Sequence, residues 1–277
     1  MASTTPDADG VRLTYDRAGD GPAVLLLHGW PGDRQDFAAV ADRLHADVLR
    51  PDLRGFGESD LRGDPGATGQ VTSLVHLLDE LDLDRVVVGG YDVGSRVAQQ
   101  LATTHPDRVS AMVLAPPLPG AGRRVLEPTS VEEFWYQSFH QLRLAEELVD
   151  GSVPAARTYL RHFWEHWSGP DFTVPGEHLD RLAAHYGRPG AFTASIGWYR
   201  AGSGTVRRAL SEQPPARRIG TWTVVLWPEF DPLFPRAWAD RVGEWFSAAT
   251  VRPLDGVGHF SPVEAPAAWA EALTEVL

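Results

Sequence analysis

Hydrophobic positions follow two different spacings in the first 119 residues of the chain. Continuous apolar runs at 23–27 and 86–88 predict buried strands, because a strand covered on both faces of a parallel sheet carries apolar side chains on both. The short segment at 11–15, Val-Arg-Leu-Thr-Tyr, predicts a first strand. Residues 71–81 instead carry apolar side chains at three- and four-residue intervals, which predicts an amphipathic helix. Strands and helices that take turns in this way are typical of an α/β fold, with a mostly parallel twisted sheet and helices on both faces.

The pattern changes in the middle of the chain. Residues 120–214 are rich in aromatic side chains, have a helical period and contain no convincing buried strand. Strand signals return at 223–227 and near Val251, and a helical pattern closes the chain. We therefore expect a core formed by 1–119 and 215–277, with the middle segment inserted as a helical cap domain. Such a cap would cover the C-terminal edge of the sheet, where open α/β sheets bind their ligands.

Composition and charge exclude several classes of function. The 277 residues are 43% hydrophobic and contain no cysteine, so disulfides and thiolate metal sites are excluded. The first ten residues lack the cationic start and apolar core of a signal peptide, and no apolar run approaches the ~20 residues of a membrane span. A net charge of −12 argues against nucleic acid or an anionic membrane as a partner. We expect a cytoplasmic protein, either a monomer or a homodimer.

One polar side chain, Asp92, stands between the strand at 86–88 and a following helical pattern. Gly90 and Gly94 flank it at a distance of two residues on either side. This spacing, small-x-nucleophile-x-small, is that of a nucleophile elbow, in which strand and helix approach so closely that side chains are excluded at the flanking positions. Ser or Cys is the usual nucleophile there, so an Asp predicts different chemistry. The alternative is a turn Asp that merely bonds to backbone N–H groups.

Four further motifs accompany the elbow in the chain. They are His-Gly-Trp-Pro-Gly at 28–32, Asp-Leu-Arg-Gly-Phe-Gly-Glu-Ser at 52–59, Phe-Asp-Pro at 230–232 and Gly-His-Phe at 258–260. In this order and spacing they resemble the α/β-hydrolase fold family over nearly the whole chain. The Asp nucleophile and the helical cap look like the branch of that family that contains epoxide hydrolases and haloalkane dehalogenases.

The resemblance implies a two-step mechanism. A carboxylate attacks a saturated carbon and forms an alkyl ester of the enzyme, so Asp92 would be the nucleophile. His259 would deprotonate the water that hydrolyses the ester, and Asp231 would orient the imidazole. The backbone N–H groups of Trp30 and Val93 would form the oxyanion hole.

Two of the proposed triad residues, Asp231 and His259, have an alternative interpretation. Glu229 lies two residues before Asp231, and Pro228 replaces the glycine usual in this motif, so Asp231 is the weaker of the assignments. His259 could also be a structural histidine, although Gly258 and the nearby end of the chain place it as the family's base.

The expected cap distinguishes epoxides from halides. Tyr136 and Tyr199 stand in segments that resemble those carrying the two tyrosines of epoxide hydrolases, which hydrogen-bond and protonate the ring oxygen. The neighbouring Trp135 and Trp198 are predicted to bind the substrate, and the indole N–H of Trp135 could also bind the oxygen. The alternative is that these aromatic side chains only fill the core of the cap.

The halide-cleaving relatives carry different residues at the corresponding positions. Haloalkane dehalogenases have Trp after the nucleophile and fluoroacetate dehalogenases have Arg, whereas this chain has Val93. Fluoroacetate dehalogenases bind the substrate carboxylate with a clamp of two arginines, of which only the second has a counterpart here, Arg96. They also carry the triad acid after the strand before the cap, where this chain reads Leu-Ala-Pro-Pro at 114–117 without a carboxylate. These differences favour an epoxide hydrolase. A dehalogenase remains the alternative, and a ligand-binding homologue without catalysis is the second.

The predicted partners are an epoxide and water, without a cofactor or a metal. The two tyrosines and ten tryptophans indicate a bulky aromatic substrate, and the chain resembles tailoring enzymes of bacterial aromatic polyketide pathways. His162, Glu165 and His166 match a zinc-peptidase pattern, but no third ligand is placed, so we interpret them as the polar face of a cap helix. The glycines around Asp92 do not form a dinucleotide-binding fingerprint.

Overall fold

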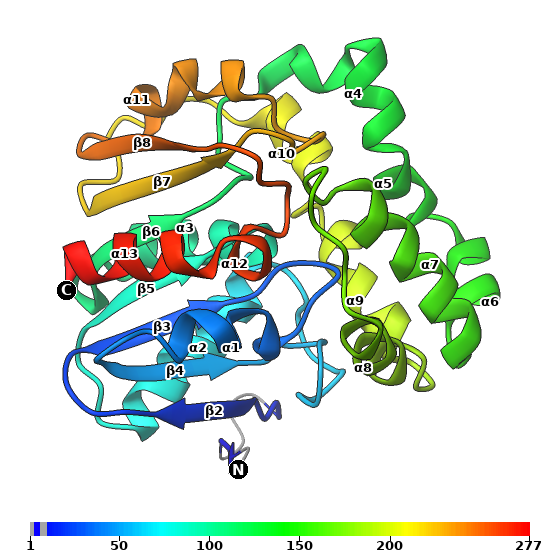
Figure 1. Cartoon of the computed structure of the whole chain (residues 1–277), viewed down its shortest axis with the longest axis horizontal. Coiled ribbons are helices and arrows are strands. Elements are labelled where there is room, and N and C mark those ends of the chain that lie inside the picture. The colour runs from blue at the N-terminus through cyan, green and yellow to red at the C-terminus, as the bar shows by residue number, and fades with distance from the viewer. Residues whose placement is uncertain (1–2, 6–9) are drawn as a thin grey trace.

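The computed structural model describes residues 3–5 and 10–277 and is organised around one eight-stranded sheet (Figure 1). The strands lie in the order β1-β2-β4-β3-β5-β6-β7-β8, with β1 and β2 antiparallel to their neighbours and the other six parallel. The strand bounds are β1 (Ser3–Thr4), β2 (Thr14–Ala18), β3 (Ala23–Leu27), β4 (Asp47–Pro51), β5 (Val86–Gly90), β6 (Val109–Leu114), β7 (Trp222–Pro228) and β8 (Ala249–Leu254).

The strands predicted from continuous apolar runs are confirmed. Strand β5 lies between β3 and β6, with Val88 paired to both Leu25 and Met112, and all five of its residues are buried. The strand predicted at 11–15 was wrong in its bounds, because β2 begins only at Thr14. The backbone of Leu13 bonds to Thr5 instead, so the chain enters the sheet three residues later than its apolar side chains indicate.

Helices cover both faces of the sheet, as the alternating pattern predicts. Helices α1 and α13 pack together in front of the sheet in Figure 1, and α2 packs with α3 behind it. The bounds in this part of the chain are η1 (Arg34–Phe37), α1 (Ala38–Ala41), α2 (Ala67–Glu80), α3 (Val93–Thr104), η2 (Pro106–Arg108), η4 (Arg236–Arg241), α11 (Val242–Trp245), α12 (Ser261–Glu264) and α13 (Pro266–Val276).

Residues 122–211 contain helices and no strand. These helices lie beside the edge of the sheet where the parallel strands end (Figure 1). Their bounds are η3 (Gly122–Leu126), α4 (Pro128–Glu133), α5 (Trp135–Phe139), α6 (Arg143–Val149), α7 (Val153–His166), α8 (Gly176–Tyr186), α9 (Ala191–Arg200) and α10 (Thr205–Ser211).

Buried aromatic contacts attach this helical segment to the sheet. The Trp164 ring on α7 stacks on Phe260 with ring centroids 3.7 Å apart, and its indole N–H donates to the carbonyl oxygen of Pro31. The backbone carbonyl of Trp167 accepts a hydrogen bond from the N–H of His259 over 2.8 Å. Helix α7 therefore contacts both of the loops that carry predicted site residues, at 28–32 and 258–260.

A polar cluster attaches α8 to the first of these loops. The Tyr186 hydroxyl bonds to both the N–H and the carbonyl of Gly32, and the Arg181 guanidinium pairs with Asp33. Burial alone would raise the pKa of Asp33, but contacts with His185 and Arg181 outweigh it and hold that pKa below its usual range. The ionised Asp33 therefore anchors α8 to the loop.

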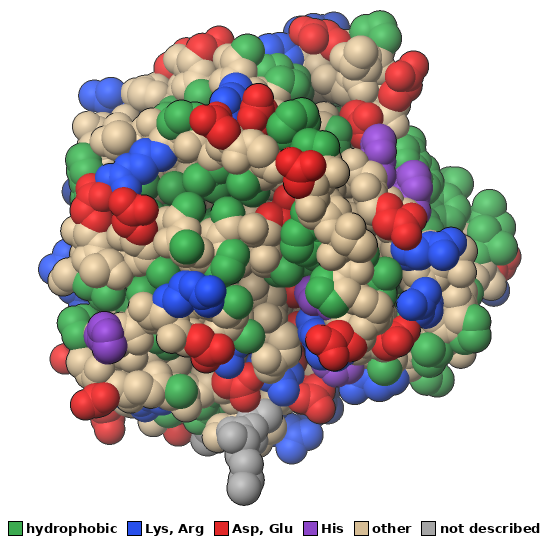
Figure 2. All heavy atoms as spheres, viewed as in Figure 1, with side chains coloured by type: hydrophobic (Ala, Val, Ile, Leu, Met, Phe, Trp, Pro, Cys, Tyr) green, Lys and Arg blue, Asp and Glu red, His purple; other side chains and the backbone are tan. Residues whose placement is uncertain are grey.

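The surface carries both signs of charge. In Figure 2, acidic and basic side chains are interspersed over the visible face, and exposed hydrophobic side chains gather over α6. None of the helices in the described part of the chain, residues 3–5 and 10–277, has the length and apolar character needed to cross a membrane.

Candidate active site

Asp92 lies at a sharp turn between β5 and α3. It precedes the first residue of α3 and has φ 48° and ψ −120°, a backbone conformation that is rare for a residue with a side chain. A Cβ atom on Gly94 would lie 2.0 Å from the carbonyl oxygen of Leu27, and one on Gly90 would lie 2.6 Å from the carbonyl oxygen of Gly94. Side chains at both flanking positions are thus excluded by backbone, as the elbow spacing predicts.

The two carboxylate oxygens of Asp92 have different surroundings. Oδ1 accepts a hydrogen bond of 2.7 Å from the backbone N–H of Trp30, whereas Oδ2 lies 3.5 Å from Nε2 of His259. Asp92 as a whole is only 6% exposed. One oxygen is therefore held by a backbone donor and the other is turned toward the imidazole.

His259 lies between two carboxylates. Its Nδ1 is 2.9 Å from Oδ2 of Asp231, whose other oxygen accepts from the N–H of Leu233. Glu229, the competing carboxylate in the sequence, instead accepts from the backbone N–H of Gly256 at the surface. The structure thus places Asp231, and not Glu229, beside the imidazole.

The protonation of His259 follows from these neighbours. Burial alone would lower the pKa of the imidazole, but the charge of Asp231, the hydrogen bond to it and the nearby carboxylate of Asp92 outweigh burial and raise it to about 10. Nε2 is buried, and within the described residues it forms no hydrogen bond of normal geometry. In the resting protein His259 is therefore an imidazolium at neutral pH, with one N–H turned toward Asp92.

Tyr136 on α5 and Tyr199 on α9 both lie beside Trp30, the residue whose backbone N–H binds Asp92. Their ring centroids are 5.6 Å apart at 89° to each other, and both rings contact Trp30, at 5.6 Å and 5.7 Å respectively. Burial, with a further contribution from the charge of Asp92, raises the pKa of both phenols well above the ordinary value. Both therefore keep their protons and can act as hydrogen-bond donors.

The remaining predicted residues lie as follows. Val93 is the first residue of α3, where backbone N–H groups have no partner within the helix. Trp198 is buried on α9. Trp135 is 41% exposed and stacks on Phe163, and no contact within the described residues supports the substrate-binding role predicted for it.

Sequence reasoning missed two polar residues in this region. Gln137 donates from Nε2 to the Tyr136 hydroxyl over 3.1 Å. His140 is buried with its ring centroid 4.8 Å from those of both Trp30 and Tyr199, and burial together with the nearby Arg200 lowers its pKa to about 3. The helical spacing of His140, four residues after Tyr136, was a signal that both lie on one helix face.

The histidines of the zinc-like pattern have other contacts. The rings of His162 and His166 stack with centroids 5.7 Å apart, and His166 bonds to Glu133. Within residues 3–5 and 10–277 no three His, Asp or Glu side chains are grouped in a way that could hold a metal ion.

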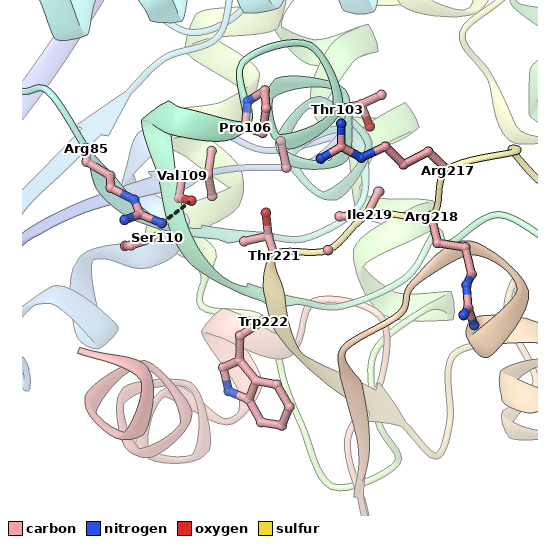
Figure 3. A pocket seen from close by; sticks show the side chains of 12 residues that line it. Arg85, Thr103, Pro106, Val109, Ser110, Arg217, Arg218, Ile219, Thr221 and Trp222 are labelled. Carbon is pink, nitrogen blue, oxygen red and sulfur yellow. Dashed lines mark hydrogen bonds between the residues drawn. The ribbon is translucent and has the colours of Figure 1, made fainter.

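A separate open cavity of about 540 Å³ lies at the opposite edge of the sheet (Figure 3). Strands β6 and β7 begin there, and the lining includes Trp222 and three arginines, with Arg85 and Arg217 on opposite sides in Figure 3. None of the predicted site residues lines this cavity.

Comparison with known proteins identifies the family. Residues 22–266 match the family described as the alpha/beta hydrolase fold. Epoxide hydrolase A of Mycobacterium tuberculosis (strain ATCC 25618 / H37Rv) is 28% identical over 98% of this chain and 95% of its own length. A solved structure of the epoxide hydrolase CorEH superposes with a TM-score of 0.85 at 22% identity, covering 100% of this chain and 98% of that one.

Some matches are partial and belong to proteins with other names. A Bacillus subtilis (strain 168) protein, provisionally named a 2-succinyl-6-hydroxy-2,4-cyclohexadiene-1-carboxylate synthase, is 39% identical over 121 residues. That alignment covers 41% of this chain and 43% of the relative, so it spans less than half of either protein. The family match, in contrast, extends over most of the chain. The protein is thus a member of the α/β-hydrolase fold family.

Proposed function

We propose that this protein is an epoxide hydrolase, which opens an epoxide to a vicinal diol through an ester on Asp92. The observation that supports this most is that two buried phenols that keep their protons, Tyr136 and Tyr199, lie beside Trp30, whose backbone N–H binds the Asp92 carboxylate. A carboxylate nucleophile needs a leaving group on a saturated carbon, and phenolic donors suit an oxygen leaving group. The 28% identity to epoxide hydrolase A over nearly the whole chain agrees with this reaction.

The first step forms the ester. Oδ2 of Asp92 attacks a ring carbon, because Oδ1 is already held by the N–H of Trp30. The new bond joins Oδ2 to carbon, and the bond between that carbon and the ring oxygen breaks. The ring oxygen keeps the electron pair and takes a proton from Tyr136 or Tyr199, so the products are a hydroxyalkyl ester and a tyrosinate.

The second step hydrolyses the ester. Formation of the ester removes the charge of Asp92, which is one of the causes that raise the pKa of His259. The imidazolium can then lose its proton, which restores the tyrosinate to a phenol, and the neutral imidazole deprotonates a water that attacks Cγ of Asp92. The N–H groups of Trp30 and Val93 would bind the resulting oxyanion on Oδ1. Collapse breaks the bond between Cγ and the substrate oxygen, and that oxygen takes the second proton of the water to complete the diol. His259 keeps the first, so Asp92 is again a carboxylate and His259 an imidazolium.

We further propose that residues 120–214 act as a cap domain over a core of 1–119 and 215–277. In this arrangement the core supplies the nucleophile and the base, and the cap supplies the proton donors. Asp92, Tyr136 and Tyr199 are all at most 6% exposed, so the reacting groups are shielded from solvent. The remaining proposals are a cytoplasmic location, a monomer or homodimer, and an epoxide and water as the partners.

An aromatic substrate, such as a polyketide intermediate, is the finer proposal. Its support is the ring of aromatic side chains around the tyrosines, in which Phe163 and Trp167 both lie against Tyr136. The polyketide origin rests on the family resemblance alone. A strong preference of the purified protein for simple aliphatic epoxides would contradict it.

Halide cleavage has less support. Arg96, the counterpart of the second arginine in a fluoroacetate clamp, is buried and paired with Glu212 at 3.0 Å. Its charge is thus already neutralised, and Val93 supplies no halide donor from its side chain.

The experiment that tests the proposal traps the ester. In His259→Gln protein the hydrolysis step should stop, so mixing with styrene oxide should add the full mass of the epoxide to the intact protein. The adduct should be absent from Asp92→Ala,His259→Gln protein. An adduct formed from a haloalkane with loss of the hydrogen halide would support the dehalogenase, and no adduct with any epoxide would refute the proposed function.

A further inference from the structure

Gln137 joins one of the two tyrosines to a distant helix. The residue is buried and follows Tyr136 on α5. Its Nε2 lies 3.1 Å from the Tyr136 hydroxyl oxygen, and its Oε1 lies 3.1 Å from the backbone nitrogen of Val206 on α10. Both ends of the side-chain amide therefore have a partner, one of them 69 residues away in the sequence.

The backbone partner fixes the orientation of this amide. The N–H of Val206 can only donate, so the oxygen end of Gln137 must face it. The nitrogen end, which can only donate, must then face Tyr136. The hydroxyl oxygen of Tyr136 is consequently the acceptor, and its own hydrogen must point in another direction.

The amide distinguishes the two phenols. The rings of Tyr136 and Tyr199 lie against each other, with centroids 5.6 Å apart. Within the described residues, however, Gln137 donates its side-chain N–H to Tyr136 and not to Tyr199. The two tyrosines are therefore not equivalent.

The packing of α10 makes this arrangement possible. A Cβ atom on Gly204 would lie 2.8 Å from Oε1 of Gln137 and 2.9 Å from Cδ1 of Tyr199. Because Gly204 has no side chain, the start of α10 can approach both residues at once. The N–H of Val206 belongs to the first turn of this helix and has no partner within it, so Gln137 satisfies a donor that would otherwise be unpaired.

We infer that Gln137 is a positioning residue that makes Tyr136, rather than Tyr199, the proton donor to the epoxide oxygen. This inference rests on the proposed function. When the O–H bond of Tyr136 breaks and the proton passes to the ring oxygen, the tyrosinate keeps the hydrogen bond from Gln137. A hydrogen bond to a charged acceptor is stronger than one to a neutral acceptor, so this donor favours the transfer.

A titration without substrate tests the inference directly. A fluorinated tyrosine, whose phenol is more acidic, replaces Tyr136, and its ionisation is followed by absorbance. Gln137→Met should raise the pKa of this phenol by about one unit, since it removes one donor to the phenolate. Gln141→Met is the control, because Gln141 lies on the same segment and its side-chain amide bonds to the backbone carbonyl of Gln137 and not to Tyr136. An unchanged pKa in Gln137→Met protein would overturn the inference.

The kinetics of ester formation give a second test. Gln137→Met should slow ester formation about tenfold and leave ester hydrolysis unchanged. Gln137→Glu has nearly the same shape, and its neutral acid can accept from Val206 and donate to Tyr136, whereas its carboxylate cannot donate. The rate of Gln137→Glu protein relative to the wild type should therefore fall as the pH rises.

The outcomes separate the two proposals. If the rate of Gln137→Glu protein relative to the wild type does not change with pH, and Gln137→Glu and Gln137→Met are equally slow, the role of Gln137 is purely structural. That result would overturn the inference. If the unaltered protein forms no ester with styrene oxide, the proposed function fails, whereas the titration of the fluorinated phenol still decides whether Gln137 acts on Tyr136.

Discussion

Nε2 of His259 lies 3.5 Å from Oδ2 of Asp92, the carboxylate oxygen that the N–H of Trp30 does not bind. At this distance the two groups attract each other as ions, but they do not form a strong hydrogen bond. Oδ2 thus keeps a lone pair for attack on carbon. In the proposed mechanism Oδ2 becomes part of the ester, and the same imidazole nitrogen then deprotonates the water that attacks Cγ.

Replacing Asp231 by asparagine should stop the reaction at the ester. The amide can no longer stabilise an imidazolium or hold the tautomer that leaves Nε2 free, so ester hydrolysis should slow by about 10³–10⁴-fold. Ester formation should change far less, and rapid mixing followed by intact-mass measurement would show the adduct accumulating. Glu229→Gln is the control, because Glu229 bonds to Gly256 and should be dispensable. Equal losses in both variants would contradict the assignment of Asp231.

The two tyrosines should differ in importance. Tyr136→Phe should slow ester formation by about 10²–10⁴-fold, the usual contribution of a general acid. Tyr199→Phe should have a smaller effect, because Tyr199 lacks the Gln137 hydrogen bond that stabilises a tyrosinate at Tyr136. Single-turnover rates with styrene oxide would measure both. A larger loss in Tyr199→Phe protein would reverse the two roles.

Ester hydrolysis should respond to pH differently from the resting protein. The pKa of His259 is raised to about 10 while Asp92 is charged, and ester formation removes that charge. The decay of the ester should therefore accelerate with rising pH through an apparent pKa below 10. An NMR titration of His259 in the free protein gives the pKa for comparison. If it equals the apparent pKa of ester decay, the charge of Asp92 does not affect the protonation of His259.

The same imidazole should make stability depend on pH. Since folding raises the pKa of His259 from 6.5 to about 10, its stabilising effect is complete below pH 6.5 and is lost as the pH rises through about 10. Urea unfolding at a series of pH values should show the free energy of unfolding falling over this interval. His259→Gln protein should lack that part of the decline, and parallel curves for the two proteins would refute the prediction.

Gly94 should tolerate no side chain. A Cβ atom there would lie 2.0 Å from the backbone oxygen of Leu27, so Gly94→Ala should lower the free energy of unfolding by about 3 kcal/mol. Gly176→Ala, at a helical position with no atom within 4 Å of the new methyl group, should be neutral or slightly stabilising. Thermal or urea unfolding of the two variants would test this, and similar stabilities would contradict the close approach at the elbow.

The sequence by itself determined the fold class and the order of the chemistry along the chain. Apolar runs such as 23–27 already carry the information that a strand is covered on both faces, because burial on both sides forbids alternation. The small residues around Asp92 likewise predict a close strand-to-helix turn, since that requirement is local. The bounds of β2 were less predictable, because the buried Leu13 bonds outside the sheet.

Only the tertiary structure decided which of several neighbours meet. Asp231 and Glu229 are two residues apart, but Asp231 bonds to His259 whereas Glu229 bonds to the backbone of Gly256. Trp135 and Tyr136 are adjacent, but the Tyr136 ring contacts Tyr199 whereas Trp135 is exposed. Gln137 depends on Val206, which is 69 residues further along the chain. Such choices depend on how separate helices and strands pack against one another, and the periodicity of a single segment does not contain that information.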